Sequence, residues 1–135
     1  MKHILALAFF ISAAVFLMSA SIFIYYLIPI KESLFQASVA VTRDLEGFDT
    51  NSTALTFGSI PLGGSSTRAI LINNSYPFPV RAKPYIEGPI SELISYNSLI
   101  IRPSEASRFS FTVSSNQYTM LGDYTGNVSI RLYRL

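Results

Sequence analysis

An unbroken apolar run close to the N-terminus constrains this chain more than any other feature. Residues 4–30 contain no Lys, Arg, His, Asp or Glu. About 20 apolar residues are enough for a helix to cross the roughly 30 Å hydrocarbon layer of a bilayer. The sequence therefore predicts a transmembrane anchor over residues 1–30, in which Tyr25 and Tyr26 lie where interfacial aromatic side chains gather.

A cleaved signal peptide is the alternative interpretation of this run. Lys2 and His3 give it a short basic start, and residues 19–21 form a small-residue motif of the kind that is cleaved. The apolar part of a signal peptide, however, usually covers about 7–15 residues. Here the apolar run continues through residues 22–24, beyond the motif, so its length favours a retained anchor.

The expected topology places the N-terminus in the cytoplasm and the rest of the chain outside the cell. Charge gives little guidance, because Lys2 on one side of the anchor faces Lys31 on the other. Three Asn-x-Ser/Thr sequences point to an exterior domain, since these are acceptors for N-glycosylation. The candidate glycosylation sites are Asn51, Asn73 and Asn127. The alternative is a Ser/Thr-rich β protein in which these sequences occur by accident.

The composition excludes several classes of chemistry. The chain has no Cys, which removes disulfides and zinc–thiolate sites. Its one histidine, His3, lies at the edge of the anchor, so a Ser-His-acid hydrolase is excluded. The net charge of +2 is too small to indicate nucleic-acid binding. We therefore expect no catalytic residues, no cofactor, no metal, no small-molecule substrate and no enzymatic activity.

Short segments with alternating apolar and polar residues follow the anchor, separated by Gly, Pro, Asn and Ser clusters. This pattern is typical of an all-β sandwich. We expect about seven strands, a linker over residues 31–37 and an immunoglobulin-like β-sandwich over residues 38–135, with barely one helical turn between Pro89 and Ser95. The expected strands are Phe35–Thr42, Ala54–Phe57, Thr67–Asn73, Val80–Tyr85, Ser98–Arg102, Arg108–Ser114 and Tyr124–Tyr133.

One stretch carries a family resemblance. Residues 57–66 read Phe-Gly-Ser-Ile-Pro-Leu-Gly-Gly-Ser-Ser, and an alternating segment follows that ends in Asn73-Asn74-Ser75. Together with Pro77–Val80 and the Phe-Ser-Phe-Thr-Val sequence of residues 109–113, this spacing resembles the ASH/MSP-type immunoglobulin-like domains. Glu105 departs from the pattern, because a turn glycine is common there. The resemblance covers about residues 38–133 and implies a fold and a binding or scaffolding role, with no common activity.

Further local features agree with such a fold. The sequence around Tyr124 resembles a tyrosine corner, with Gly126 where an antibody domain carries cysteine. Asn73 and Asn74 are residues that tolerate the left-handed region at a strand exit. In layout alone, one anchor followed by one exterior domain resembles archaeal envelope proteins and the stator-type accessory proteins of the archaeal rotary filament.

Two groups of side chains form a candidate interaction surface. The aromatic residues Tyr76, Phe78, Tyr85 and Tyr96 suit a sugar or a protein neighbour, and packing within the core or its rim is the alternative. Arg81 and Lys83 alternate on one strand and suit anionic lipid or an acidic partner, whereas a solvated strand face is the plainer account. The acidic residues 44–49 suit a hard cation by their oxygen atoms or a solvated loop, and the second is favoured because no bidentate acid follows.

These observations lead to a functional expectation. We expect a non-enzymatic single-pass membrane protein whose exterior domain is a structural or interaction module in a cell-surface or membrane assembly, with a protein partner and the lipid bilayer as neighbours. One alternative is a binding module for an exterior polymer such as an S-layer glycan. The other is an accessory subunit of a respiratory or transport complex in the membrane.

Overall fold

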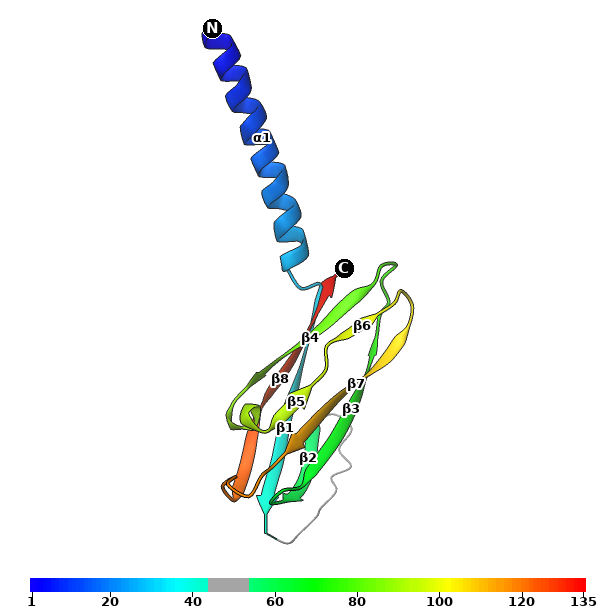
Figure 1. The fold of residues 1–135 in the computed structure, drawn as a ribbon. Helices are drawn as coiled ribbons and strands as arrows, with labels where there is room; N and C mark the ends of the chain where they lie inside the picture. Colours follow the sequence, from blue (N-terminus) through cyan, green and yellow to red (C-terminus); the bar gives the residue numbers. More distant parts are fainter. Residues whose placement is uncertain (44–53) are drawn as a thin grey trace.

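The structure is a computed structural model that describes residues 1–43 and 54–135. These residues form a long N-terminal helix and a β domain made of two sheets (Figure 1). The helix α1 (Lys2–Leu27) extends away from the β domain, and the end of the chain lies beside the point where the two meet.

Helix α1 is apolar on all sides. It has 26 residues, which at 1.5 Å per residue makes it about 39 Å long, and none of them is buried. Its mean hydropathy reaches 2.4, so it is long and apolar enough to span a bilayer. The hydroxyls of Ser12, Ser19 and Ser21 donate to carbonyls of their own helix, which satisfies them without water.

The chain passes from helix to sheet with almost no connection. Ile28 leaves the helical conformation, and Pro29, which cannot continue a helical hydrogen-bond ladder, follows it. The amide of Ile30 then donates to the carbonyl of Leu132 at 2.8 Å, and strand β1 (Lys31–Thr42) begins at the next residue. The linker expected over residues 31–37 is therefore corrected to the first half of β1. Lys31 and Ser33 are polar residues at inward positions of β1, so the apolar–polar alternation typical of a strand is not visible in this part of the sequence.

Two sheets make up the β domain. The larger has the order β2-β1-β8-β4-β6 and the smaller has the order β3-β7-β5. Strands β1 and β2 are parallel, and the other described pairs are antiparallel. The remaining strands are β2 (Leu55–Pro61), β3 (Ser65–Asn73), β4 (Val80–Glu87), β5 (Ile94–Tyr96), β6 (Leu99–Ile101), β7 (Ala106–Ser114) and β8 (Gly122–Arg134). A 3₁₀ turn, η1 (Pro89–Glu92), lies between β4 and β5.

The core lies between the inner faces of the two sheets. Phe109 and Phe111 of β7 have ring centroids 4.8 Å apart and both are buried. From the larger sheet, β8 contributes its alternate residues Val128, Ile130 and Leu132. In β7 and β8 the apolar residues that alternate with polar ones in the sequence therefore face the core.

Glycine is required at two positions in the larger sheet, one for its backbone conformation and one for a close approach. Gly58 has φ of 73° at a bulge where the β1–β2 register shifts between Ser38 and Ala40, and a positive φ strains other residues. At Gly126, a Cβ atom would lie 2.1 Å from the carbonyl oxygen of Glu87. Strands β4 and β8 can approach each other here only because Gly126 has no side chain.

A tyrosine and a buried asparagine make hydrogen bonds to the connections between strands. The hydroxyl of Tyr124 donates to the carbonyl of Met120 at 2.9 Å, which is the bond a tyrosine corner makes. Asn73 and Asn74 do not adopt the left-handed region, since Ser104 is the one non-glycine residue with positive φ among those described. Asn74 is instead fully buried, and its amide donates to the carbonyls of Phe78, Ile101 and Arg102.

Candidate interaction surface at the helix–domain junction

One arginine ties the helix to the β domain. The guanidinium carbon of Arg134, in β8, lies 3.9 Å from the ring centroid of Tyr25 in the last turn of α1 and 5.6 Å from that of Phe78. Its Nη1 also donates to the Tyr25 carbonyl at 3.5 Å. The Nε atom is buried and has no hydrogen-bond partner in the described part of the chain. Arg134 is therefore held chiefly by the two rings, whose faces attract a cation.

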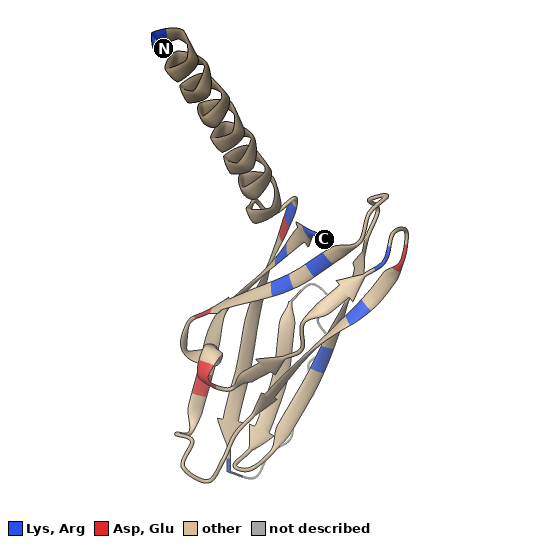
Figure 2. Cartoon of the chain, turned by 45° about the horizontal axis from the view of Figure 1, so that its top comes forward, with Lys and Arg blue, Asp and Glu red and all other residues tan. Residues whose placement is uncertain are grey.

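Next to this contact lies a surface that we call the basic-aromatic face. It is the outer side of β4 and β8, where the strand period of two brings alternate residues together. The register sets Lys83 opposite Arg131 and Arg81 opposite Tyr133. Figure 2 shows Lys and Arg on β4 close to the point where α1 meets the β domain. The basic-aromatic face consists of Arg81, Lys83, Tyr85, Arg131 and Tyr133.

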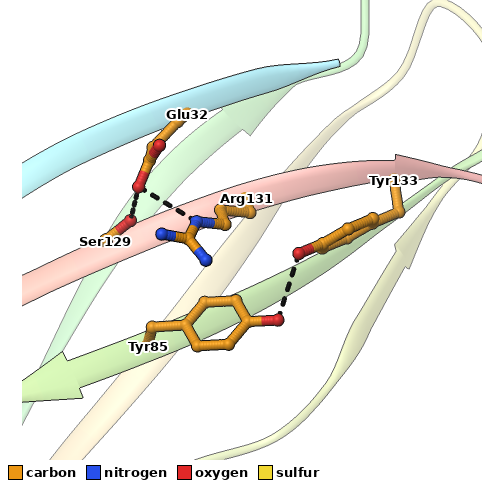
Figure 3. A network of polar contacts seen from close by, with 5 residues as sticks. All are labelled: Glu32, Tyr85, Ser129, Arg131 and Tyr133. Atoms are coloured by element: carbon orange, nitrogen blue, oxygen red, sulfur yellow. Dashed lines mark hydrogen bonds and ion pairs between the residues drawn. The ribbon is translucent and has the colours of Figure 1, made fainter. Parts of the chain in front are cut away.

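A carboxylate from β1 neutralises one of these cations. Glu32 accepts hydrogen bonds from the hydroxyl of Ser129 and from Nε of Arg131, the latter at 3.0 Å (Figure 3). The Ser129 hydrogen bond, followed by the one from Arg131, lowers the pKa of Glu32. The hydrogen bond to Glu32 raises the pKa of Arg131 in turn. The pair is solvent-exposed, so its main effect is to fix the position of the Arg131 side chain.

Two tyrosines order the centre of the face. The guanidinium of Arg131 lies 4.4 Å from the ring centroid of Tyr85, and the Lys83 ammonium lies 5.5 Å from that of Tyr133. The two hydroxyl oxygens are 3.0 Å apart and share a hydrogen bond (Figure 3). This bond, followed by burial, raises the pKa of Tyr133. The Tyr133 phenol is therefore neutral at physiological pH, and each of the two rings packs against a cation from the neighbouring strand.

A hollow of about 320 Å³ lies between this face and the end of α1. Arg81 and Lys83 line it, and neither makes an ion pair with a carboxylate of the described residues. Arg134 also lines it, and no Asp or Glu side chain does so. The complete lining is Tyr26, Leu27, Arg81, Lys83, Tyr85, Tyr133, Arg134 and Leu135. The hollow therefore combines three cationic side chains with an apolar wall from the helix.

The residues predicted from sequence as one interaction surface lie in three places. Arg81, Lys83 and Tyr85 share the outer side of β4. Tyr76 and Phe78 stack on each other in the connection from β3 to β4, with ring centroids 5.4 Å apart and half-buried. Tyr96 lies on β5 of the smaller sheet, against Phe111. Tyr76 and Tyr96 pack mainly as rim residues, whereas Phe78 also faces Arg134 at the junction.

Sequence reasoning missed three residues of the junction: Arg131, Tyr133 and Arg134. Arg131 and Tyr133 alternate with the apolar residues of their strand, which predicts that they lie on its outward side, as they do, but indicates no role for them. Their spacing of two residues, one basic and one aromatic, repeats that of Lys83 and Tyr85 and was the available signal. The pairing itself depends on the β4–β8 register, which joins segments 48 residues apart.

The candidate glycosylation sites are placed separately from the junction. Asn73 and Asn127 are both exposed, the first at the end of β3 and the second in the middle of β8. Asn51 and the acidic residues 44–49 lie outside the described residues.

A second cavity, of about 220 Å³, opens between the sheets near Phe35, Ile72 and Ile130. Lys31 is the single charged residue in its lining, so this cavity brings no acid and base together. Among residues 1–43 and 54–135, no group of three or more His, Cys, Asp or Glu side chains is positioned to hold a metal ion. The junction is therefore the feature with the clearest recognition chemistry in the part that the structure describes.

Comparison with known proteins yields no relative: no protein-family model, no curated protein and no solved structure matches the chain.

Proposed function

We propose that this chain is a non-enzymatic single-pass membrane protein whose β domain is an interaction module in a membrane or cell-surface assembly. The observation that carries the proposal is the direct passage from α1 to β1 through residues 28–30, reinforced by the contact between Arg134 and Tyr25. With α1 in a bilayer, the β domain stays at its surface and presents fixed faces to lateral neighbours. A freely projecting receptor domain would have a longer linker.

We further propose that the β domain is an immunoglobulin-like sandwich. Two sheets share one core, and after β3 the chain alternates between them from strand to strand. The tyrosine-corner bond from Tyr124 to Met120 is a further point of support. Domains of this type commonly serve binding and scaffolding and share no common reaction, which agrees with an interaction role.

The proposed localisation is the cell membrane, with the N-terminus in the cytoplasm and the β domain outside. Support comes from the exposed candidate glycosylation sites Asn73 and Asn127. Because the chain has no Cys, a Tyr118→Cys variant carries a single thiol in an exposed loop. A membrane-impermeant maleimide should label it in intact cells. Labelling only after lysis would place the domain in the cytoplasm.

Site-specific cross-linking tests the assembly role. Single cysteines at Ser38 and Thr112 place a photoactivatable cross-linker on the outer sides of the larger and the smaller sheet, respectively. In native membranes, a module fixed at the surface should cross-link to the same membrane protein repeatedly from one face and much less from the other. Mass spectrometry of the products identifies the partner. Equal, non-specific products from both faces would contradict the proposal.

A second candidate function is recognition of an exterior polymer such as a surface glycan. The observation that favours it is the outer side of the smaller sheet, where hydroxyl side chains line up and Thr67 and Thr112 share a hydrogen bond at 2.8 Å. Arg108 is the one charged residue on the β3 and β7 rows of that side, which are otherwise Ser65, Thr67, Ala69, Leu71, Asn73, Ala106, Ser110, Thr112 and Ser114. Retention of the full chain on immobilised surface glycan, lost in Thr67→Val/Thr112→Val, would support this function over the first.

A further inference from the structure

We propose that the hollow between the end of α1 and the basic-aromatic face binds the phosphate headgroup of an anionic lipid from the leaflet that α1 enters. The inference deepens the proposed function, because it rests on α1 lying in a bilayer. It assigns a ligand to Arg81, Lys83 and Arg134.

The first argument is depth. Tyr25 and Tyr26 occupy the last turn of α1, the position at which aromatic side chains of a spanning helix meet the headgroup layer. Arg134 lies 3.9 Å from the Tyr25 ring centroid, and Tyr26 itself lines the hollow. The cations that line the hollow are therefore held at the level of the lipid phosphates.

The second argument is charge. Arg131 is neutralised by Glu32 at 3.0 Å, whereas Arg81 and Lys83 have no carboxylate partner among the described residues. Guanidinium and ammonium groups are the usual protein ligands of phosphate. Ordinary surface lysines and arginines face water on all sides, but these two share a hollow with a third cation and with no acidic side chain. An anion entering the hollow would thus meet three cationic side chains and no Asp or Glu side chain.

The third argument identifies the anion as part of a lipid. Tyr26 and Leu27 form one wall of the hollow, and they belong to the same apolar helix that would contact acyl chains. A lipid can place its phosphate among the cations and its glycerol and upper acyl carbons on this wall. A water-soluble phosphate would gain nothing from the wall, and an acidic protein segment would have to displace lipid from the helix to reach it.

Native mass spectrometry of the full chain in a neutral detergent tests the inference. The probes are dioctanoyl phosphatidylglycerol and dioctanoyl phosphatidylcholine, which differ in net charge and share their acyl chains. The wild-type protein should retain the anionic lipid preferentially. Arg81→Gln/Lys83→Gln should reduce that retention roughly 25-fold, about fivefold for each cation removed. The matched control Arg43→Gln/Arg108→Gln loses the same charge from residues that do not line the hollow and should stay within about twofold of wild type.

Several results would overturn the inference. These are equal retention of the two lipids by wild type, equal losses in the two double variants, or displacement of the anionic lipid by glycerol phosphate at a similar concentration. Cross-linking of an acidic protein from a cysteine at Lys83 would assign the face to a protein instead. Circular dichroism of both variants confirms that they fold. If the lipid preference is intact but no protein partner is found, only the proposed assembly role is contradicted. If a protein partner is found but the lipid preference is absent, only this inference is contradicted.

Discussion

Arg134 and Tyr25 are 109 residues apart in the sequence, yet the guanidinium carbon of one lies 3.9 Å from the ring centroid of the other. The peptide connection at Pro29 is the other link between the helix and the β domain. The helix and the β domain are consequently joined at two points instead of one. This limits how the domain can tilt relative to the helix, and it makes Arg134 the natural site for a perturbation.

Replacement of Arg134 by Gln should loosen the junction, because it removes the cation that the Tyr25 and Phe78 rings hold. Spin labels on cysteines introduced at Met18 and Tyr118 report the distance between helix and far loop by pulsed electron spin resonance. The distance distribution should broaden in Arg134→Gln and also in Tyr25→Leu. The control Arg108→Gln removes a cation from the smaller sheet and should leave the distribution unchanged. Equal widths in all four proteins would show that the contact does not restrain the helix.

Glu32 makes the stability of the domain sensitive to acid. Since its pKa is lowered in the folded state, first by the Ser129 hydrogen bond, its contribution is present above the ordinary value of 4.5. That contribution is lost as the pH falls through the lowered pKa. Between pH 7 and pH 3, the melting temperature of wild type should therefore fall further than that of Glu32→Gln. Equal decreases in the two melting temperatures would mean that the hydrogen bonds from Ser129 and Arg131 to Glu32 do not stabilise the folded state.

Gly126 should tolerate no side chain. In Gly126→Ala, the added Cβ would meet the Glu87 carbonyl oxygen at 2.1 Å and the Ile90 side chain at 2.7 Å. The backbone must shift to relieve this, so we expect a loss of about 1–3 kcal/mol in the free energy of unfolding. The neighbouring exposed Thr125→Ala should stay within about 0.5 kcal/mol of wild type. Urea denaturation measures both, and an unchanged midpoint for Gly126→Ala would refute the close approach.

Asn74 should contribute more to the stability of the fold than its polar character indicates. Its buried amide donates to the carbonyls of Phe78, Ile101 and Arg102, so Asn74→Ala removes a donor that the three carbonyls share. The expected loss is about 1–3 kcal/mol. Asn73→Ala, one residue earlier and exposed, is the matched control and should be close to neutral. If chemical denaturation gave the same small change for both variants, the bonds of Asn74 would carry no net stabilisation.

Strand positions with strict alternation were predictable from the sequence. In β7 and β8, large apolar residues alternate with polar ones, and the structure buries Phe109, Phe111, Val128 and Ile130 as expected. Other elements lack such a signal. Strand β5 has three residues, too few to show a period, and it was missed. Strand β1 was expected to begin at Phe35, because Lys31 and Ser33 are polar residues on the inward side of its open end.

The candidate site was only half accessible to sequence reasoning. Arg81, Lys83 and Tyr85 alternate within one segment, so their common face follows from the geometry of a strand. Their neighbours Arg131 and Tyr133 are brought beside them by strand register, which depends on how the whole core packs. The contact between Arg134 and the end of the helix depends in addition on the direction in which α1 leaves the β domain. Neither of these relationships leaves a local pattern in the chain.

The central claim, that the β domain is held at the surface of a bilayer spanned by α1, is tested most directly by depth measurements on the reconstituted full chain. A fluorophore on a single cysteine at Leu135 marks the junction, and one at Leu62 marks the turn between β2 and β3 at the other end of the domain. Lipids with a spin label on the headgroup should quench the first fluorophore strongly and the second hardly at all. Equal quenching at the two positions, or none at either, would contradict the claim.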